Sequence, residues 1–219
     1  MNFVAHVEVA NRVVVTGGTS GPGLQPTMVG AALPDMAAIG GFRLRPRGTE
    51  GALGEGVRLH HRTDEVFHAD ERFRELMGRL RSSLTAAGVG RGPARACGHL
   101  GVELLLDGRL QDDREVVDRV DALLWSVGNP TADVVDAVPE AEQTSWADHL
   151  ALVSKRIAPE SYRVVPLVAA RLHRILARRP RLAFDEVDVP VLSDELRRIQ
   201  ADVDEVANDL VTDTAAAVG

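Results

Sequence analysis

The chain has 219 residues and a formal net charge of −7, with 45% apolar but only 4% aromatic residues. This length predicts one medium-sized domain with a core built mainly of Ala, Val and Leu. Lysines and arginines are spread along the sequence, so there is no basic stripe for a nucleic-acid backbone. We therefore expect no nucleic-acid partner.

The sequence carries no pattern typical of a signal peptide or a membrane span. No charged region followed by an apolar run stands at its start. No apolar stretch reaches the roughly 20 residues that a membrane helix needs. The single cysteine, Cys97, has no partner for an internal disulfide, as is usual in a reducing compartment. These features predict a soluble, cytoplasmic protein without a membrane partner.

Apolar residues recur with the helical period of 3.6 along almost the whole chain, although Val13–Val15 would also suit a short strand. Glycine- and proline-rich segments predict loops at 17–26 and 48–56, and Thr27 and Thr144 or Ser145 are expected helix caps. The expected helices are 2–14, 27–39, 57–69, 71–87, 93–110, 113–127, 131–137, 144–157, 160–178 and 192–212. The pattern predicts a single all-α domain over residues 1–219, folded as a helical bundle.

Ionisable side chains repeat at four-residue spacing in two of these helices. The helix expected over 57–69 carries His60, Asp64 and His68. Four residues correspond to a rotation of about 40° beyond a full turn, so the three side chains follow one stripe of the helix surface. The helix expected over 93–110 repeats the arrangement with His99, Glu103 and Asp107.

Leu100, Leu104 and Leu106 lie beside the second stripe, and its acids lie within the apolar sequence VELLLDG, so the stripe is expected to border the core. Imidazole and carboxylate groups are ligands that divalent cations prefer, and facing helices of bundles commonly supply them. We therefore predict that the two stripes face each other and form one metal site. The alternative is an ordinary ion pair between His60 and Asp64 and a solvated acidic face on the second helix.

A divalent cation at such a site favours phosphoester chemistry. The cation neutralises phosphoryl oxygens and generates a nucleophile from water near neutral pH. The competing chemistry is that of a redox di-iron centre, which usually shows Glu-x-x-His on paired helices. No such pair is present in this sequence, so hydrolysis of a phosphate ester is the predicted reaction.

Four segments, in this order and at similar spacing, resemble the acyl carrier protein phosphodiesterase family, whose members are distant relatives of the HD-type phosphohydrolases. The segments are MNFVAHVEVA at the start, GAALPDM, LHHRTD and ARRPRL. The resemblance implies an HD-phosphohydrolase-like all-α fold and metal-dependent hydrolysis of a phosphodiester. The product expected for this family is phosphopantetheine, released from the serine of holo acyl carrier protein.

The resemblance also implies roles for particular residues. It places His6 and Asp35 at the family's histidine and acidic positions and maps the His-Arg-x-Ile-Asp motif onto His60 and Asp64. With the second stripe, the predicted metal ligands are His6, Asp35, His60, Asp64, His99, Glu103 and Asp107. The cation is expected to be manganese, with magnesium or iron(II) as alternatives. Asp64 and His68 are the predicted catalytic residues, His68 as the proton-transfer group.

The chain departs from the family pattern at several positions. The family's Asp and His that follow its motif Asp correspond here to His68 and Asp70, in exchanged order. Its later Asp-His pair appears as Asp107–Gly108, so one imidazole is missing, and His99 is the expected replacement. The loss of that imidazole leaves open a non-catalytic helical protein that retains the fold.

Arginines are the expected phosphate ligands, because guanidinium forms charge-assisted bonds to phosphate. The predicted substrate-binding residues are Arg62, Arg178, Arg179 and Arg181. The alternative interpretation of the last three is structural. Basic residues favour the last turn of a helix, and Pro180 ends the helix. An acidic carrier protein further requires a local basic surface, expected in FRLRPRG at Arg43, Arg45 and Arg47. The alternative substrate is a nucleotide or another small phosphate ester, which needs only a pocket.

Overall fold

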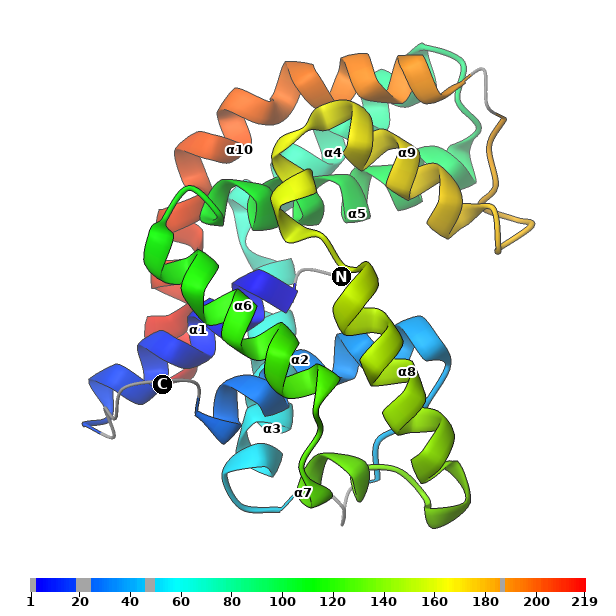
Figure 1. Ribbon diagram of the computed structural model, residues 1–219. Coiled ribbons are helices and arrows are strands. Elements are labelled where there is room, and N and C mark those ends of the chain that lie inside the picture. The colour runs from blue at the N-terminus through cyan, green and yellow to red at the C-terminus, as the bar shows by residue number, and fades with distance from the viewer. Residues whose placement is uncertain (1–2, 19–24, 46–49, 186–187) are drawn as a thin grey trace. The chain divides into compact units, whose positions relative to one another are not determined.

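The computed structural model describes residues 3–18, 25–45, 50–185 and 188–219. Every regular element within these ranges is a helix, so the all-α prediction is confirmed (Figure 1). The described residues form two compact units, and the chain passes between them more than once. Unit 1 comprises residues 67–111 and 159–210, and unit 2 comprises residues 3–66, 112–158 and 211–219.

Unit 2 contains the N-terminal helices and a second group from the middle of the chain. They are α1 (Phe3–Thr16), α2 (Pro26–Gly40), α3 (Gly51–Ala69), α6 (Arg114–Gly128), α7 (Ala132–Val135) and α8 (Gln143–Arg156), with a 3₁₀ turn, η1 (Glu140–Glu142). The inner half of α1 is buried almost completely, including the charged residue Glu8. Arg119 of α6 and Arg12 both bind the Glu8 carboxylate, at 2.7 and 3.0 Å. This pairing offsets the cost of burying the charge.

Unit 1 is built around α5, whose buried face includes Val102, Leu104, Leu105, Leu106 and Leu110. Its helices are α4 (Glu71–Ala86), α5 (Arg91–Leu110), η2 (Pro159–Arg163), α9 (Val165–Leu176) and most of α10 (Asp188–Val218). The side chain of Asp70 separates α3 from α4, because its carboxylate accepts hydrogen bonds from the backbone N–H groups of Arg72 and Phe73. This is the usual N-cap arrangement for a helix start.

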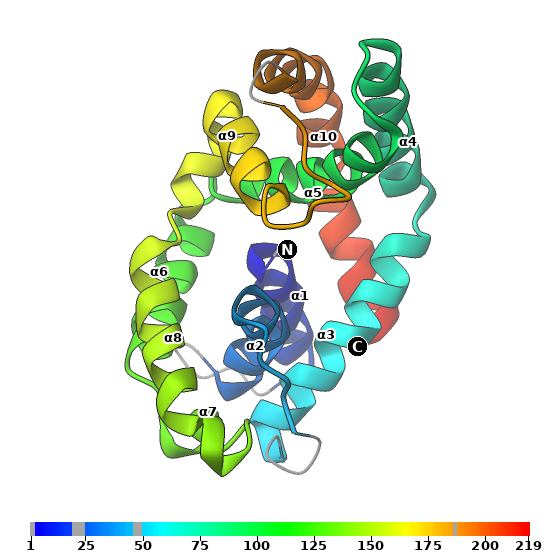
Figure 2. The ribbon, with the colours of Figure 1, turned by 90° about the vertical axis from the view of Figure 1, so that its right-hand side faces the viewer.

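Two glycines allow α2 and α3 to approach unusually closely. One of them, Gly56, lies in a segment that we expected to be a loop. A Cβ atom at Gly30 would lie 2.1 Å from the carbonyl oxygen of Leu53, and one at Gly56 would lie 2.0 Å from that of Thr27. The segment 48–56 was expected to be a loop because it is glycine-rich, but α3 already begins at Gly51. Here glycine serves helix packing instead of a turn, at the point where α2 and α3 cross. Figure 1 and Figure 2 show the two helices running in different directions.

Other helix boundaries also differ from the predicted ones. Helix α2 begins at Pro26, after Gln25, so Thr27 is not its cap; proline suits a first turn, where its missing N–H leaves no bond unmade. The same residue type explains α9, which begins at Val165 with Pro166 in its first turn, not at 160. Helix α8 begins at Gln143 after Glu142, not at a Thr144 or Ser145 cap.

Helix α10 starts at Asp188 and extends to Val218, beyond the expected range of 192–212. Most of the predicted loop at 17–26 lies outside the described residues. Within the part of the chain that the structure describes, no helix combines the length and the apolar character needed to cross a membrane.

Cys97 lies on the buried face of α5 with 1% of its surface exposed. Burial disfavours the thiolate and raises the pKa of the Cys97 thiol to about 12. We therefore expect the native protein to react with a thiol reagent such as dithionitrobenzoate far more slowly than the urea-unfolded chain. A comparison of the two reaction rates at pH 8 tests this, and equal rates would contradict the burial of the thiol.

Candidate metal centres

Three donor side chains from α1 and α3 converge within unit 2. His6 Nε2 lies 3.2 Å from Asp64 Oδ1, and His60 Nε2 lies 3.4 Å from Asp64 Oδ2. The two imidazole rings stack on each other, with their centroids 3.9 Å apart. One nitrogen or oxygen of each residue lies within 4.8 Å of the others, which is close enough for one metal ion to reach all three. We call these residues the unit 2 group.

The contact of His60 Nδ1 fixes which nitrogen carries the hydrogen when the ring is neutral. His60 Nδ1 lies 2.9 Å from the backbone carbonyl of Ala31, which can only accept a hydrogen bond. Nδ1 therefore carries the hydrogen, and Nε2 of a neutral ring presents its lone pair toward the Asp64 carboxylate. Two acceptors facing each other need a cation between them, either a proton or a metal ion. Histidines that bind metals commonly donate their other N–H to a carbonyl in this way.

His6 is 2% exposed, and its Nδ1 atom finds no hydrogen-bond partner among the described residues. In either neutral form of the ring, one polar nitrogen of His6 is therefore left unsatisfied or faces an acceptor. Burial lowers the pKa of His6, and the neighbouring His60 lowers it further, although the Asp64 carboxylate acts in the opposite direction. A buried neutral imidazole with a free lone pair is a suitable ligand for a borderline divalent cation.

Asp35 of α2 belongs to the same electrostatic environment. Its charge raises the pKa of both His6 and His60, which places it near the two rings. Its Oδ2 atom is buried and has no hydrogen-bond partner in the described part of the chain. The structure therefore places Asp35 in the surroundings of the unit 2 group, to which helices α1, α2 and α3 all contribute.

The charges within the unit 2 group support one another. Burial alone raises the pKa of the Asp64 carboxyl, but the hydrogen bonds from His6 and His60 outweigh it and hold this pKa well below its usual range. Burial likewise favours the neutral form of His60, yet Asp64 and Asp35 raise the pKa of His60 above its ordinary value. The group thus retains a carboxylate and attracts positive charge into the space between the side chains.

A second set of donors lies in unit 1 and is defined here as the unit 1 group: His68, His99 and Glu103. His99 Nε2 and His68 Nε2 lie 2.8 and 3.3 Å from the same carboxylate oxygen, Glu103 Oε1. The donor atoms again lie within 4.8 Å of one another. Gly98 brings this part of α5 close to α4, since a Cβ there would lie 2.9 Å from the Met77 carbonyl oxygen.

The unit 1 group combines a buried anion with two partly accessible imidazoles. The Glu103 side chain is 3% exposed, whereas His68 and His99 are 35% and 40% exposed. Burial on its own raises the pKa of Glu103, but surrounding positive charge and the hydrogen bonds from His68 and His99 hold it below its usual range. Glu103 therefore stays ionised beneath two solvent-accessible nitrogen donors.

The structure divides the predicted stripes differently from the sequence pattern. His60 and Asp64 join His6 in unit 2, whereas His68 joins His99 and Glu103 in unit 1. The reason is helix geometry, because a rotation of about 40° per four residues turns His68 about 80° away from His60. Asp107, at the same distance from His99 along α5, is completely buried and lies outside the unit 1 group.

Gly108, where the resemblance led us to expect a histidine, has a packing role. A Cβ atom at Gly108 would lie 2.5 Å from the carbonyl oxygen of Tyr162 and 2.6 Å from its carbonyl carbon. The backbone of η2 thus occupies the space that any larger side chain would need. The packing of η2 on α5 therefore leaves no room for an imidazole at this position.

We expect Gly108→Ala to lower the free energy of unfolding by about 2–3 kcal/mol, because backbone atoms of η2 must shift to admit the methyl group. Gly78→Ala on α4 is the matched control. Nothing lies within 4 Å of its Cβ position, so it should raise stability by about 0.5–1 kcal/mol through helix propensity. Urea unfolding followed by circular dichroism measures both, and a Gly108→Ala protein as stable as the parent would refute the packing role.

Of the predicted phosphate-binding arginines, Arg62 belongs to unit 2, whereas Arg178, Arg179 and Arg181 belong to unit 1. Arg62 binds Glu55 at 3.1 Å and the carbonyl of Val218 at 3.4 Å. Two residues along a helix correspond to about 200°, so Arg62 points away from the side that carries His60. Arg178, Arg179 and Arg181 are exposed in the turn that follows α9. Of the arginines expected to form a basic surface, Arg45 binds the carbonyl of Asp136, and Arg47 lies outside the described residues.

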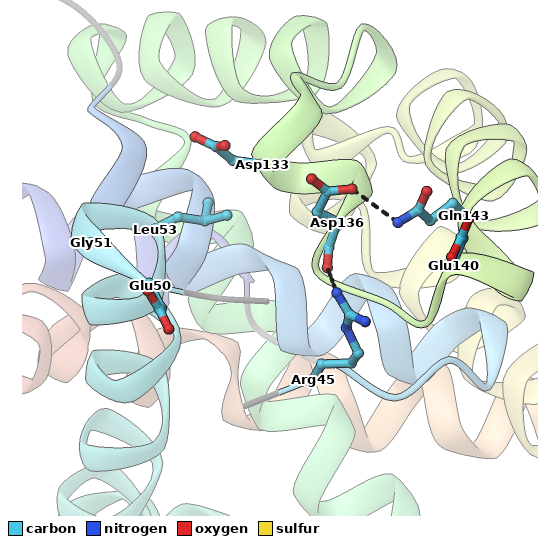
Figure 3. A pocket seen from close by; sticks show the side chains of 8 residues that line it. All are labelled: Arg45, Glu50, Gly51, Leu53, Asp133, Asp136, Glu140 and Gln143. Atoms are coloured by element: carbon cyan, nitrogen blue, oxygen red, sulfur yellow. Dashed lines mark hydrogen bonds between the residues drawn. The ribbon is translucent and has the colours of Figure 1, made fainter. Parts of the chain in front are cut away.

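The surroundings of Arg45 form a cavity in unit 2 that is acidic instead of basic (Figure 3). In Figure 3, Asp136 lies between Arg45 and Gln143. Its backbone carbonyl accepts a hydrogen bond from Arg45, and its carboxylate accepts one from Gln143. Asp133, Glu140 and Glu50 also line the cavity. None of the histidines of the unit 2 group lines it, so this cavity gives no support to phosphate binding.

Comparison of the chain with protein-family models, with curated proteins and with solved structures finds no match. The sequence pattern missed the carbonyl of Ala31 as the partner of His60, since no side-chain motif marks it. It also missed the pairing of His68 with the second helix, which the 40° drift along α3 would have indicated.

Proposed function

We propose that this protein is a metal-dependent phosphodiester hydrolase that resembles acyl carrier protein phosphodiesterase. The observation that carries the proposal is the orientation of His60. Its Nδ1–H donates to the carbonyl of Ala31, which turns the Nε2 lone pair toward Asp64 and creates a position for a cation. The orphaned Nδ1 of His6 and Oδ2 of Asp35 add further unsatisfied donors around that position.

His6, His60 and Asp64 would hold the cation, with Asp35 close by as a further carboxylate. Mixed imidazole and carboxylate donors suit manganese or iron(II), and they suit magnesium less because it prefers oxygen ligands. When bound, such a cation neutralises phosphoryl oxygens and activates water as a nucleophile near neutral pH. The chain's own contribution is to keep Asp64 ionised and His6 neutral, so that both are ready to bind.

The unit 1 group offers the same types of donor, and we propose that it binds a second divalent cation. His68 has a further role open to it, because an imidazole that is oriented by a buried carboxylate can transfer protons to and from a substrate. Metal analysis distinguishes one occupied site from two. The parent protein should retain two equivalents of manganese, and His99→Ala should retain one.

The proposed reaction is tested with holo carrier protein and a panel of small phosphate esters, each with added manganese or magnesium. Release of phosphopantetheine that depends on the metal supports the proposal. If only small esters are turned over, the substrate is a small phosphate ester and not the carrier protein. A protein that retains no metal after loading would count against the proposal and support a non-catalytic helical protein.

A further inference from the structure

A group of exposed arginines in unit 1 has no acidic partner within the part of the chain that the structure describes. Elsewhere in the same unit, arginines are paired, such as Arg79 with Asp202 at 2.6 Å and Arg163 with Asp204 at 3.5 Å. Among the described residues, no carboxylate lies within ion-pair distance of the following side chains, which we call the arginine surface: Arg81, Arg91, Arg95, Arg174, Arg178, Arg179 and Arg181.

The arginine surface originates in two parts of the sequence that lack acidic residues. Between Glu75 and Glu103 there is no Asp or Glu, and the same holds between Glu160 and Asp185. Both stretches contain several arginines, whereas the whole chain has a net charge of −7. These two stretches therefore carry a net positive charge, whereas the remainder of the chain is strongly acidic.

The fold of unit 1 brings the two stretches together. Arg81 at the end of α4 lines one hollow with Arg91 and Arg95 at the start of α5. The backbone of Arg181 packs on the first turn of α5, since a Cβ at Gly92 would lie 2.9 Å from its carbonyl oxygen. The turn between α4 and α5 and the end of α9 lie at the same end of unit 1 in Figure 1.

Like charges at this density repel one another, and no carboxylate in the described chain relieves the repulsion. An acidic partner would relieve it. At physiological salt, charges interact over about 8 Å, so a small partner with a compact acidic face meets only the arginines. A long polyanion such as nucleic acid would also meet the acidic remainder of the chain. The charge distribution therefore favours a protein partner with a local acidic surface.

We propose that the arginine surface docks the acidic face of a protein substrate. This inference rests on the proposed function, under which that substrate is holo acyl carrier protein. The arginine surface takes the place of the basic surface that the sequence suggested around Arg45. Docking at this surface would hold the carrier protein on unit 1, the unit that also carries the unit 1 group.

The test is the affinity for holo carrier protein, measured by calorimetry on the metal-loaded protein at 0.15 M and 0.5 M salt. We expect the triple variant Arg81→Glu, Arg91→Glu, Arg95→Glu to bind at least about tenfold more weakly than the parent at 0.15 M salt. The difference should shrink at 0.5 M salt, because screening weakens the charge attraction. Turnover of a small phosphate ester should be unchanged, since such a substrate does not need the docking surface.

A matched control reverses exposed arginines that already have acidic partners, with Arg114→Glu and Arg197→Glu. This control should bind the carrier protein within about twofold of the parent. Equal affinity of the parent and the triple variant would overturn the docking proposal, as would tighter binding of a single-stranded oligonucleotide or of anionic vesicles. Salt-sensitive binding of carrier protein without any hydrolysis would support the docking surface while counting against the proposed function.

Discussion

Asp64→Ala is expected to abolish retention of the cation by the unit 2 group and to lower hydrolysis by about 100-fold or more. The two oxygens of this carboxylate are the atoms toward which both His6 and His60 point, at 3.2 and 3.4 Å. Without the carboxylate, two stacked imidazoles remain with no nearby counter-charge except Asp35. A cation there would lose its strongest ligand, and protonation of His60 would lose its main source of stabilisation.

The matched control is Glu65→Ala, which removes an exposed carboxylate from the adjacent position of α3. Metal content after dialysis and the rate of ester hydrolysis are measured for both variants and for the parent. Because Asp64 is 37% exposed, its replacement should leave the helix content unchanged. Wild-type metal content and activity in Asp64→Ala would exclude the unit 2 group as the catalytic centre.

Gly56→Ala is expected to lower the free energy of unfolding by about 3 kcal/mol or more. The added methyl group would lie 2.0 Å from the carbonyl oxygen of Thr27 and 2.8 Å from the backbone N of Ala31, so α2 and α3 must separate. Separation of these helices also moves the carbonyl of Ala31 away from His60 Nδ1. The variant should therefore bind manganese more weakly even under conditions where it is folded.

Chemical unfolding and manganese titration at low temperature measure the two effects of Gly56→Ala. Gly78→Ala serves again as the control, because its Cβ position is open and it lies on a helix that is remote in sequence from α2. A Gly56→Ala protein with unchanged stability would show that the close approach of α2 and α3 is not required. Lower stability with unchanged metal affinity would separate this helix contact from the function of His60.

The sequence pattern predicted the helical fold class and the residue types of the metal centres, but it placed several features wrongly. Apolar periodicity depends on local burial, so it identified helices reliably within most of their bounds. Glycine is ambiguous, because it marks turns and also permits close helix packing. The glycines at 51–56 were therefore assigned to a loop, although Gly56 lies within α3 and contacts α2.

The predicted site was a single one, made of two facing stripes, and its residues instead occupy two groups. A four-residue repeat predicts one face of a helix only over short distances, since it drifts relative to the helical period. His60 and Asp64 were correctly associated, whereas His68 was not part of their group. His6 and Asp35 were identified only through the family resemblance, because no local spacing relates α1 and α2 to α3. The carbonyl of Ala31 depends on packing between helices and has no sequence signature.

Neither unit is formed from one continuous segment of the chain. Unit 2 needs residues 211–219 as well as the N-terminal helices, and Leu210 and Val211 are consecutive residues of α10 that belong to different units. During synthesis, unit 2 therefore cannot be completed until the last turns of α10 have left the ribosome. Helices α1 and α3, which carry His6 and His60, are made early, but the packing of unit 2 is complete only after residues 211–219 have been made. A chaperone that shields α1 to α3 during that interval would protect apolar surface that is buried only after this segment has been made.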